Sequence, residues 1–354
     1  ALSVVFARDL ITLYVFWEFM ALSSVMLVLL RDTNRSRLSA ARYLLVHIAG
    51  GLVLLAGIVL HINSTGSIQF TSFTTQSLSS WLMLIGVLVN AAAVPFSSWL
   101  ADAYPESTVM GGVVLSAYTS KTAVYTLLRG FIGWDILIWL GVAMTIYGVI
   151  YALLENDIRR ILAYSIIDQV GFMVCAAGIG TPLAIAGACA HAFCHIIYKS
   201  LLFMSAGAVI HRTGKSKCTD LGGLYQSMPK TFVFGTIGAL AISSVPFTSG
   251  FISKTIILKS VELQHLFWPW FFLEVASAAV FLVAGLKFPY FIFFGKDSGL
   301  KPKEANRPML MSMGFLAVLC IYLGCFPNTL YQLLPYKEVL LSYVPNTFSG
   351  IYID

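Results

Sequence analysis

Ten long apolar runs divide this chain, and each is long enough to cross the hydrocarbon core of a lipid bilayer. A crossing helix needs about 20 apolar residues. The runs are too long and too continuous for the alternating strands of a membrane barrel, which are about 10 residues each. We therefore predict an all-α polytopic membrane protein with about ten transmembrane helices. The spans lie near residues 10–30, 43–62, 78–100, 109–130, 134–154, 161–180, 183–210, 231–262, 267–294 and 308–334.

Composition supports a lipid environment. Of the 354 residues, 58% are apolar and only 11% are charged, whereas a soluble domain carries about a quarter charged residues. The mean hydropathy is +0.84. These values exclude a soluble globular protein, a disordered chain and a nucleic-acid binder, despite the net charge of +6. The six cysteines are scattered singly, without a disulfide frame or a metal-ligand pattern, and we expect no cofactor and no metal.

The basic residues orient the predicted bundle. If the first span runs inward, 14 of the 22 basic residues fall in inner loops and four fall on the outer side. The positive-inside rule then places the C-terminus outside, and we expect a multi-pass protein of the inner (cytoplasmic) membrane. The inner set is Arg31, Arg35, Arg37, Arg42, Arg159, Arg160, Arg212, Lys215, Lys217, Lys230, Lys296, Lys301, Lys303 and Arg307.

Four lysines remain inside the apolar runs, where an unpaired charge costs several kcal/mol. Acidic and imidazole groups lie at similar depth. The combination predicts a polar axis through the membrane that suits proton relay, because buried lysine releases its proton readily and histidine titrates near neutral pH. The lysines are Lys121, Lys199, Lys254 and Lys287, and the other groups are Glu18, Glu274, His47, His191 and His195.

Some of these groups have alternative interpretations. Lys287 lies near a helix end and can extend to the interface, His47 can bond a neighbouring backbone group, and Glu274 can serve in helix packing. His191, His195 and Lys199 recur every four residues, which places them along one side of a helix over roughly 12 Å with a drift of about 40° per step. A zinc site competes with a proton ladder here, but no HExxH pattern is present and the third member is lysine.

Two nearly identical pentapeptides interrupt the third and eighth spans. They are Val94-Pro95-Phe96-Ser97-Ser98 and Val245-Pro246-Phe247-Thr248-Ser249. Proline breaks the helical hydrogen-bond ladder, which at membrane depth requires protein or a polar cavity to satisfy the freed groups. Because the two spans are five apart, they run in opposite directions. The pattern predicts an inverted-topology repeat with two proline-broken helices, an arrangement that marks the ion site in secondary transporters.

Six segments resemble the antiporter-like membrane subunits shared by respiratory complex I and the Mrp-type cation/proton antiporters. The resemblance is strongest to the D-type Mrp subunit and to the closely similar central and distal subunits of complex I. That resemblance implies a subunit of fourteen helices with a broken seventh and twelfth helix. The ten spans here correspond to its fifth to fourteenth helices, so we expect either a fragment or a short form. The segments are DLITLYVFWEFMALSS (9–24), VPFSSWLADAYP (94–105), SKTAVYTLLR (120–129), DIRRILAYSIIDQVGF (157–172), HAFCHIIYKSLLFMSAGAVI (191–210) and GFISK (250–254).

The resemblance also implies roles for individual residues. Glu18 matches an essential glutamate whose partner is a lysine on the first broken helix. Counting back nine residues from Trp99 places that lysine at position 90, where this chain has Asn90. Lys121 matches a central lysine, and Lys254 matches the terminal lysine after the second break. His191, His195 and Lys199 match the group that links the two, and Arg159 stands where many members have lysine.

The function implied is proton translocation along this Glu/Lys/His chain, within a multisubunit Na⁺/proton antiporter. Three alternatives stay open: Lys121 takes over the pairing of Glu18, the chain is a complex I subunit, or it is a non-transporting structural subunit. We expect other membrane subunits, lipid, protons and in one alternative Na⁺ as partners, no nucleic acid, and no catalytic activity of the chain's own. We treat residues 1–354 as a single membrane domain, with a conducting core at 9–262 and C-terminal helices at 267–334.

Overall fold

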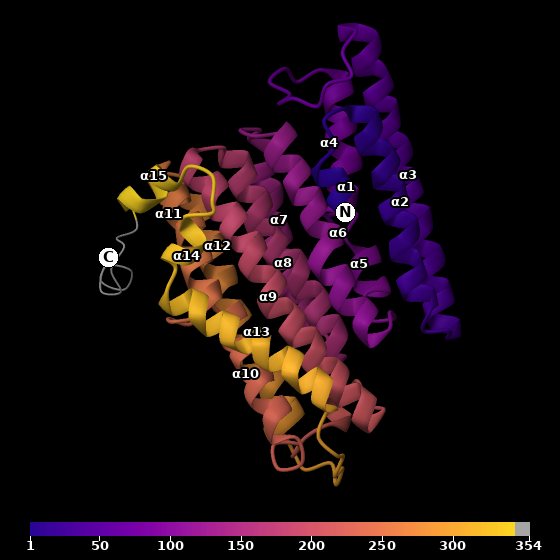
Figure 1. Cartoon of the computed structure of the whole chain (residues 1–354), viewed down its shortest axis with the longest axis vertical. Helices are drawn as coiled ribbons and strands as arrows, with labels where there is room; N and C mark the ends of the chain where they lie inside the picture. The colour runs from indigo at the N-terminus through magenta and orange to yellow at the C-terminus, as the bar shows by residue number, and fades with distance from the viewer. Residues whose placement is uncertain (344–354) are drawn as a thin grey trace.

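The computed structural model describes residues 1–343, and within that range every regular element is a helix (Figure 1). The predicted all-α fold is confirmed. Seven of its helical segments are long and apolar enough to cross a membrane. They are α2 (Leu10–Leu29), α3 (Asn34–Thr65), α7 (Ile136–Leu154), α8 (Ile158–Ile179), α9 (Pro182–Thr213), the continuous segment Phe267–Phe294 and α13 (Arg307–Cys325).

The other three predicted spans are α6 and two broken helices. α6 (Val109–Gly130) has spanning length, but its lysine, arginine and hydroxyl side chains lower its hydropathy. The broken helices are α4 (Leu78–Asn90) with α5 (Ser98–Ala103), and α10 (Pro229–Ile242) with α11 (Ser249–Leu263). The long segment Phe267–Phe294 divides into α12 (Phe267–Val280) and the π-helices η2 (Phe281–Lys287) and η3 (Tyr290–Phe294). The remaining short elements are α1 (Leu2–Val5), η1 (Cys218–Asp220), α14 (Asn328–Tyr331) and α15 (Lys337–Tyr343).

Two predicted boundaries differ from the structure for local reasons. The span expected at 43–62 begins at Asn34, because Thr33 and Ser36 form a capping box that starts the helix before the apolar run. The span expected at 308–334 ends at Cys325, and Pro327 separates it from α14. We predicted that the C-terminus lies on the outer side. That prediction concerns residues 344–354, which lie outside the described residues.

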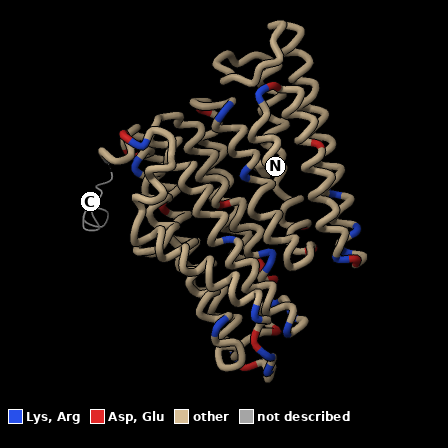
Figure 2. Tube along the Cα trace, in the orientation of Figure 1, with Lys and Arg blue, Asp and Glu red and all other residues tan. Residues whose placement is uncertain are grey.

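Charged residues gather at the two ends of the bundle, and few lie between them (Figure 2). The lower end in that view carries the loop after α9 and the loop before α13. Both loops belong to the basic set that we assigned to the inner side. The structure therefore keeps these two basic loops at the same end of the bundle.

The two helix breaks have the same backbone geometry. α4 ends at Asn90, Ala92 follows with φ +56°, and the Ala93 N–H donates to Leu88 O at 3.0 Å. α10 ends at Ile242, Ser244 follows with φ +55°, and the Val245 N–H donates to Leu240 O at 3.1 Å. This is the Schellman pattern, which closes a helix end and here uses a residue other than glycine.

The breaks also enter the bundle from opposite ends. α4 descends from the upper end of Figure 1, whereas α10 rises from the lower end. Pro95 and Pro246 lie in the non-helical segments that separate each pair, at residues 91–97 and 243–248. The two proline-broken helices of the predicted inverted repeat are therefore present.

α8 is the central helix of the site, and its surroundings explain why it can carry polar groups. The side chain of Asp157 accepts hydrogen bonds from the backbone N–H groups of Arg159 and Arg160, which starts the helix, and Gly180 ends it at φ +69°. Its whole apolar window is buried inside the protein. Polar residues on α8 therefore face other helices and do not face lipid.

Close contact between α7 and α8 depends on glycines. A Cβ atom on Gly171 would lie 2.6 Å from Gly141 O, and one on Gly148 would lie 2.6 Å from Asp168 N. Missing side chains let the two backbones approach, as is common for helix pairs in membranes. Gly148 thereby sets the position of Asp168, which is part of the site described below.

We expect Gly171→Val to destabilise the α7–α8 pair, because the added methyl groups would collide with backbone atoms that have no room to move. Overpacking of this kind costs about 1–3 kcal/mol. Thermal unfolding in detergent measures the effect, with Ala143→Val on the exposed face of α7 as the control. Equal unfolding temperatures for Gly171→Val and the control would show that the close approach is not needed.

Candidate functional site

Lys254 lies directly after the second helix break and is 1% exposed. Its Nζ lies 3.3 Å from Ile242 O, the last carbonyl of α10, and 3.4 Å from Ser277 Oγ on α12. Nζ also lies 5.1 Å from the centre of the Phe172 ring. The carbonyl end of a helix carries partial negative charge, so the break supplies a favourable position for a lysine ammonium group.

Lys199 is fully buried on α9 and reaches across to α8. Its Nζ donates to Leu162 O at 3.0 Å and to the Ser165 hydroxyl. Lys121, on α6, bonds within its own helix, with Nζ 2.6 Å from Ser116 O and 3.2 Å from Ser120 Oγ. Within residues 1–343, the ion pairs shorter than 4.0 Å lie at helix ends and in loops and include none of these lysines.

His191 and His195 lie between these lysines on α9, with ring centres 6.2 Å apart. Nδ1 of His191 lies 3.0 Å from Ser253 Oγ on α11, whereas neither ring nitrogen of His195 has a hydrogen-bond partner. Both rings are fully buried. In the described part of the chain, no group of three or more His, Cys, Asp and Glu side chains could hold a metal ion.

A chain of side-chain hydrogen bonds continues from His191 to α8. The Tyr198 hydroxyl lies 3.5 Å from His191 Nε2 and donates to Gln169 Oε1 at 3.0 Å. Nε2 of Gln169 then donates to Asp168 Oδ2 at 2.5 Å. The four side chains are fully buried. Together with the contact between His191 and Ser253 they join α8, α9 and α11 by groups that donate and accept hydrogen bonds.

Asp168 was absent from the residues that we predicted to form the site. It is fully buried, its Oδ1 has no hydrogen-bond partner, and it interacts electrostatically with Lys254 and Lys199. The signal was present in the sequence, because an acidic residue in the middle of the apolar run 161–180 is rare without a function. Asp168 is thus a buried acidic group whose electrostatic interactions include both Lys199 and Lys254.

The predicted residues of the first half lie around the first helix break. Glu18, on α2, is half-buried; its Oε1 has no hydrogen-bond partner and lies where a side chain on Gly51 of α3 would be. Asn90 is the last residue of α4, and its Oδ1 lies 3.2 Å from His47 Nε2. All hydrogen bonds of the Lys121 ammonium group go to α6, and the structure does not bring that lysine into an ion pair with Glu18.

Two further candidates bind backbone carbonyls. Arg159 donates to the carbonyls of Pro105, Ser107 and Thr108 at 2.8–2.9 Å, and so holds the loop between α5 and α6. Lys287 donates to the carbonyls of Ala152, Leu153 and Glu155, and so caps the end of α7.

Glu274 is half-buried on α12 and interacts electrostatically with Lys254. Ser277 lies three residues further along the same helix and contacts the Lys254 ammonium group. Residues three apart share a helix face. The face of α12 that meets Lys254 is therefore polar, whereas the rest of the helix is apolar.

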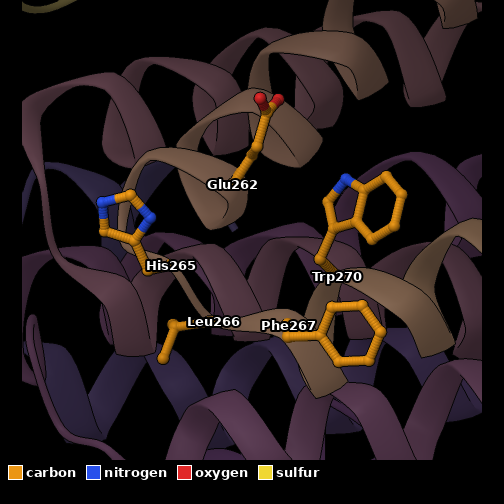
Figure 3. A pocket seen from close by; sticks show the side chains of 5 residues that line it. All are labelled: Glu262, His265, Leu266, Phe267 and Trp270. Atoms are coloured by element: carbon orange, nitrogen blue, oxygen red, sulfur yellow. The ribbon is translucent and has the colours of Figure 1, made fainter.

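Two of the cavities near the helix ends bear on the site. The first, of about 410 Å³, is lined by charged and polar residues of the basic end, among them Arg31, Glu106, Asp157 and Arg159. The other, of about 390 Å³, lies between the end of α11 and the start of α12 (Figure 3). Its Glu262 lies two turns beyond Lys254 on α11, roughly 12 Å along the helix, so this cavity is separate from the buried lysines.

Comparison with known proteins gives a consistent result. The family described as NADH:quinone oxidoreductase/Mrp antiporter, TM matches residues 7–282. The probable A/B subunit of a K⁺/H⁺ antiporter from Rhizobium meliloti is 29% identical over 92% of this chain, and the A1 subunit of a Na⁺/H⁺ antiporter from Staphylococcus haemolyticus is 31% identical over 94%. The chain spans 35% and 47% of the lengths of these two relatives.

Solved structures show the same fold. A chain of the Mrp complex from a Dietzia species superposes with a TM-score of 0.88 at 20% identity, over 99% of this chain and 77% of that one. A chain of respiratory complex I from Thermus thermophilus superposes with a TM-score of 0.81 at 22% identity, over 92% and 75%. The predicted arrangement of helices is therefore confirmed.

Proposed function

This chain belongs to the NADH:quinone oxidoreductase/Mrp antiporter, TM family, and we propose that it translocates protons as one membrane subunit of a multisubunit monovalent cation/proton antiporter. Family membership and seven helices of spanning length make it a multi-pass membrane protein. The observation that carries the proposal is the set of buried lysines on α6, α9 and α11, namely Lys121, Lys199 and Lys254. Such groups are expensive inside a membrane and mark ion or proton paths.

In the proposed mechanism, the lysines are the proton carriers and the histidines lie between them. A lysine ammonium group bonded only to neutral oxygens can release its proton at modest cost, because burial favours the neutral amine. His191 and His195 then relay protons between Lys121, Lys199 and Lys254. Each transfer changes the charge next to the following carrier, so the sites titrate as a coupled set.

We place the proton access route from the cytoplasm at the charged cavity near Arg159, because the basic loops around it mark the inner side. Arg159 and Lys287 then serve structural roles, since the two terminal nitrogens of Arg159 and the ammonium group of Lys287 donate to backbone carbonyls. The orientation, the inner-membrane location and the treatment of the chain as one membrane domain belong to the same proposal. Glu18 and Glu274 are the acidic groups at the two breaks, and Na⁺ is the proposed exchanged cation.

Two other functions compete for specific reasons. The fold matches a chain of respiratory complex I, which favours a subunit whose proton movement is driven by quinone reduction elsewhere in a complex. Asn90 in place of a cation at the first break favours a structural subunit that does not transport. A proton gradient produced by an imposed Na⁺ or K⁺ gradient supports the antiporter, one produced by NADH oxidation supports the complex I subunit, and neither supports a structural role.

Lys121→Ala tests the proposal directly. We expect proton flux in membrane vesicles carrying the full assembly to fall about 100-fold or more, because loss of one proton-transfer group typically costs that much. Lys215→Ala is the control, since Lys215 is exposed after α9. Equal flux in the wild type, Lys121→Ala and Lys215→Ala, at equal amounts of assembled protein, would refute proton transfer through this lysine.

A further inference from the structure

A second polar cluster lies where α2, α3 and α4 meet, and the mechanism above leaves it unused. His47 on α3 is 3% exposed. Its Nδ1 lies 2.9 Å from Tyr43 O and its Nε2 lies 3.2 Å from Asn90 Oδ1. The ring stacks on Tyr43 at 3.9 Å and meets the edge of Trp99 at 4.4 Å. Both ring nitrogens face oxygen acceptors, which is the hydrogen-bond geometry of an imidazolium cation.

Asn90 can also serve the neutral form of this histidine. A carboxamide presents an acceptor and a donor, and a half-turn of the group exchanges them. Asn90 Nδ2 is buried without a partner in the present arrangement. After the half-turn, Nδ2 would donate to the unprotonated Nε2 of His47. Asn90 therefore matches either protonation state of His47, whereas a lysine ammonium group at this position could only donate.

The carboxylate of Glu18 lies on the same face of α3. Its Oε1 occupies the space that a side chain on Gly51 would take, and it has no hydrogen-bond partner. Gly51 follows His47 by four residues, which is one helical turn and roughly 6 Å along the axis. The carboxylate thus lies beside the surface of α3 to which His47 belongs, and the missing side chain at Gly51 makes that approach sterically available.

Few other charged groups compete for this position. On α6, which packs against α2 and α4, Lys121 donates within its own helix, and Arg129 donates to the carbonyls of Ala7 and Phe70. On α2 the titratable residues are Tyr14 and Glu18, and α4 carries none. Asp102 on α5 is already paired with Arg42 at 2.8 Å. Tyr43 and Tyr104 are neutral phenols in their ordinary state. Glu18 is therefore the one acidic group on α2, α3, α4 and α5 that lacks a basic partner.

We propose that His47 is the proton-carrying partner of Glu18, and that Asn90 is the hydrogen-bond partner that accommodates both charge states of His47. Transfer of one proton from the imidazolium to the carboxylate neutralises both groups together. The pair has zero net charge before and after the transfer, which limits its cost inside the membrane. The inference rests on the proposed transport function, and it adds a proton-transfer pair at the first break.

A set of three variants tests the pair by moving the cation across the 3.2 Å contact between His47 and Asn90. His47→Gln keeps a polar side chain but cannot carry a proton, and we expect flux to fall about tenfold or more. Asn90→Lys places a second cation against His47 and should also slow flux. In His47→Gln/Asn90→Lys the cation lies on α4, and we expect most of the flux to return. Wild-type flux in His47→Gln, or a double variant no better than His47→Gln, would overturn the proposal.

The matched control is His61→Gln, because His61 lies on the same helix and contacts only the edge of Phe73 among the ring contacts described. If His47→Gln yields too little assembled protein, Asn90→Leu removes the same hydrogen bond from the α4 side at similar volume. Slower flux in Asn90→Leu supports the pair, and wild-type flux in that variant contradicts it.

A spectroscopic measurement separates this inference from the transport function. The infrared carboxyl band that disappears in Glu18→Gln reports the protonation of Glu18 as pH changes. We expect the pH midpoint of this band to change in His47→Gln and to stay constant in His61→Gln. An unchanged midpoint in His47→Gln overturns the pairing even if transport is intact. Flux that is unaffected by Lys121→Ala and Lys254→Ala would instead overturn the transport function. The infrared result would still decide whether Glu18 and His47 are paired.

Discussion

Lys254→Ala is expected to lower proton flux about 100-fold or more, because it removes the last buried lysine after the second helix break. The ammonium group lies against the carbonyl end of α10 and the Ser277 hydroxyl, and the side chain is 1% exposed. Flux in vesicles containing the full assembly, at matched protein levels, is the measurement. Lys259→Ala is the matched control, since Lys259 lies on the same helix with a half-exposed side chain.

Lys254→Arg distinguishes a proton carrier from a fixed positive charge. Arginine keeps the cation and its hydrogen bonds, but it does not give up a proton within proteins. We therefore expect Lys254→Arg to lose flux nearly as completely as Lys254→Ala. Flux close to that of the wild type in Lys254→Arg would mean that only the positive charge matters, and Lys254 would no longer be assigned as a carrier.

The fold was largely predictable because lipid constrains it so strongly. Continuous apolar runs have one good solution in a bilayer, and Pro95 and Pro246 mark the two places where the helices must open. The exact ends of those helices were not predictable. They depend on capping by residues such as Thr33 and on the Schellman closures at Ala92 and Ser244, which lie outside or at the edge of the apolar pattern.

The site was predictable where one helix carries it and not where several helices meet. The four-residue spacing of His191, His195 and Lys199 correctly placed them along α9. It could not show that their drift turns His191 toward Ser253 on α11 and Lys199 toward Ser165 on α8. The contact between His47 and Asn90 joins residues 43 apart in sequence, and spacing within a single helix carries no information about such a pair.

Lys287 illustrates the same limit. Its place in an apolar run left two interpretations open, a buried functional cation or a side chain that extends to the interface. In the structure Lys287 is partly exposed and caps the carbonyl end of α7, which agrees with the second interpretation. That partner lies more than 130 residues away in sequence, so the choice depended on tertiary structure alone.

Asp168→Asn is the second change for which we expect a large effect. Asp168 is the buried acid that interacts with both Lys199 and Lys254, and asparagine keeps its shape and a hydrogen-bond acceptor while removing its charge. Taking one partner from a buried ionic group leaves the others uncompensated, at a cost of about 3–5 kcal/mol. The lysines can avoid this cost by losing their protons. They would then stay neutral and would no longer act as proton carriers.

We therefore expect Asp168→Asn to assemble and to lose flux about 10-fold to 100-fold, with a changed dependence on pH. Asp102→Asn is the control, because it removes the same charge from an ion pair with the exposed Arg42 side chain at a helix end.

The link through Gln169 makes a second comparison available. Gln169→Leu breaks the hydrogen-bond chain to Tyr198 but keeps the charge of Asp168. If Asp168 acts by charge alone, Gln169→Leu keeps its flux. If the hydrogen-bonded chain itself conducts protons, both variants lose it, and wild-type flux in Asp168→Asn would rule out both roles.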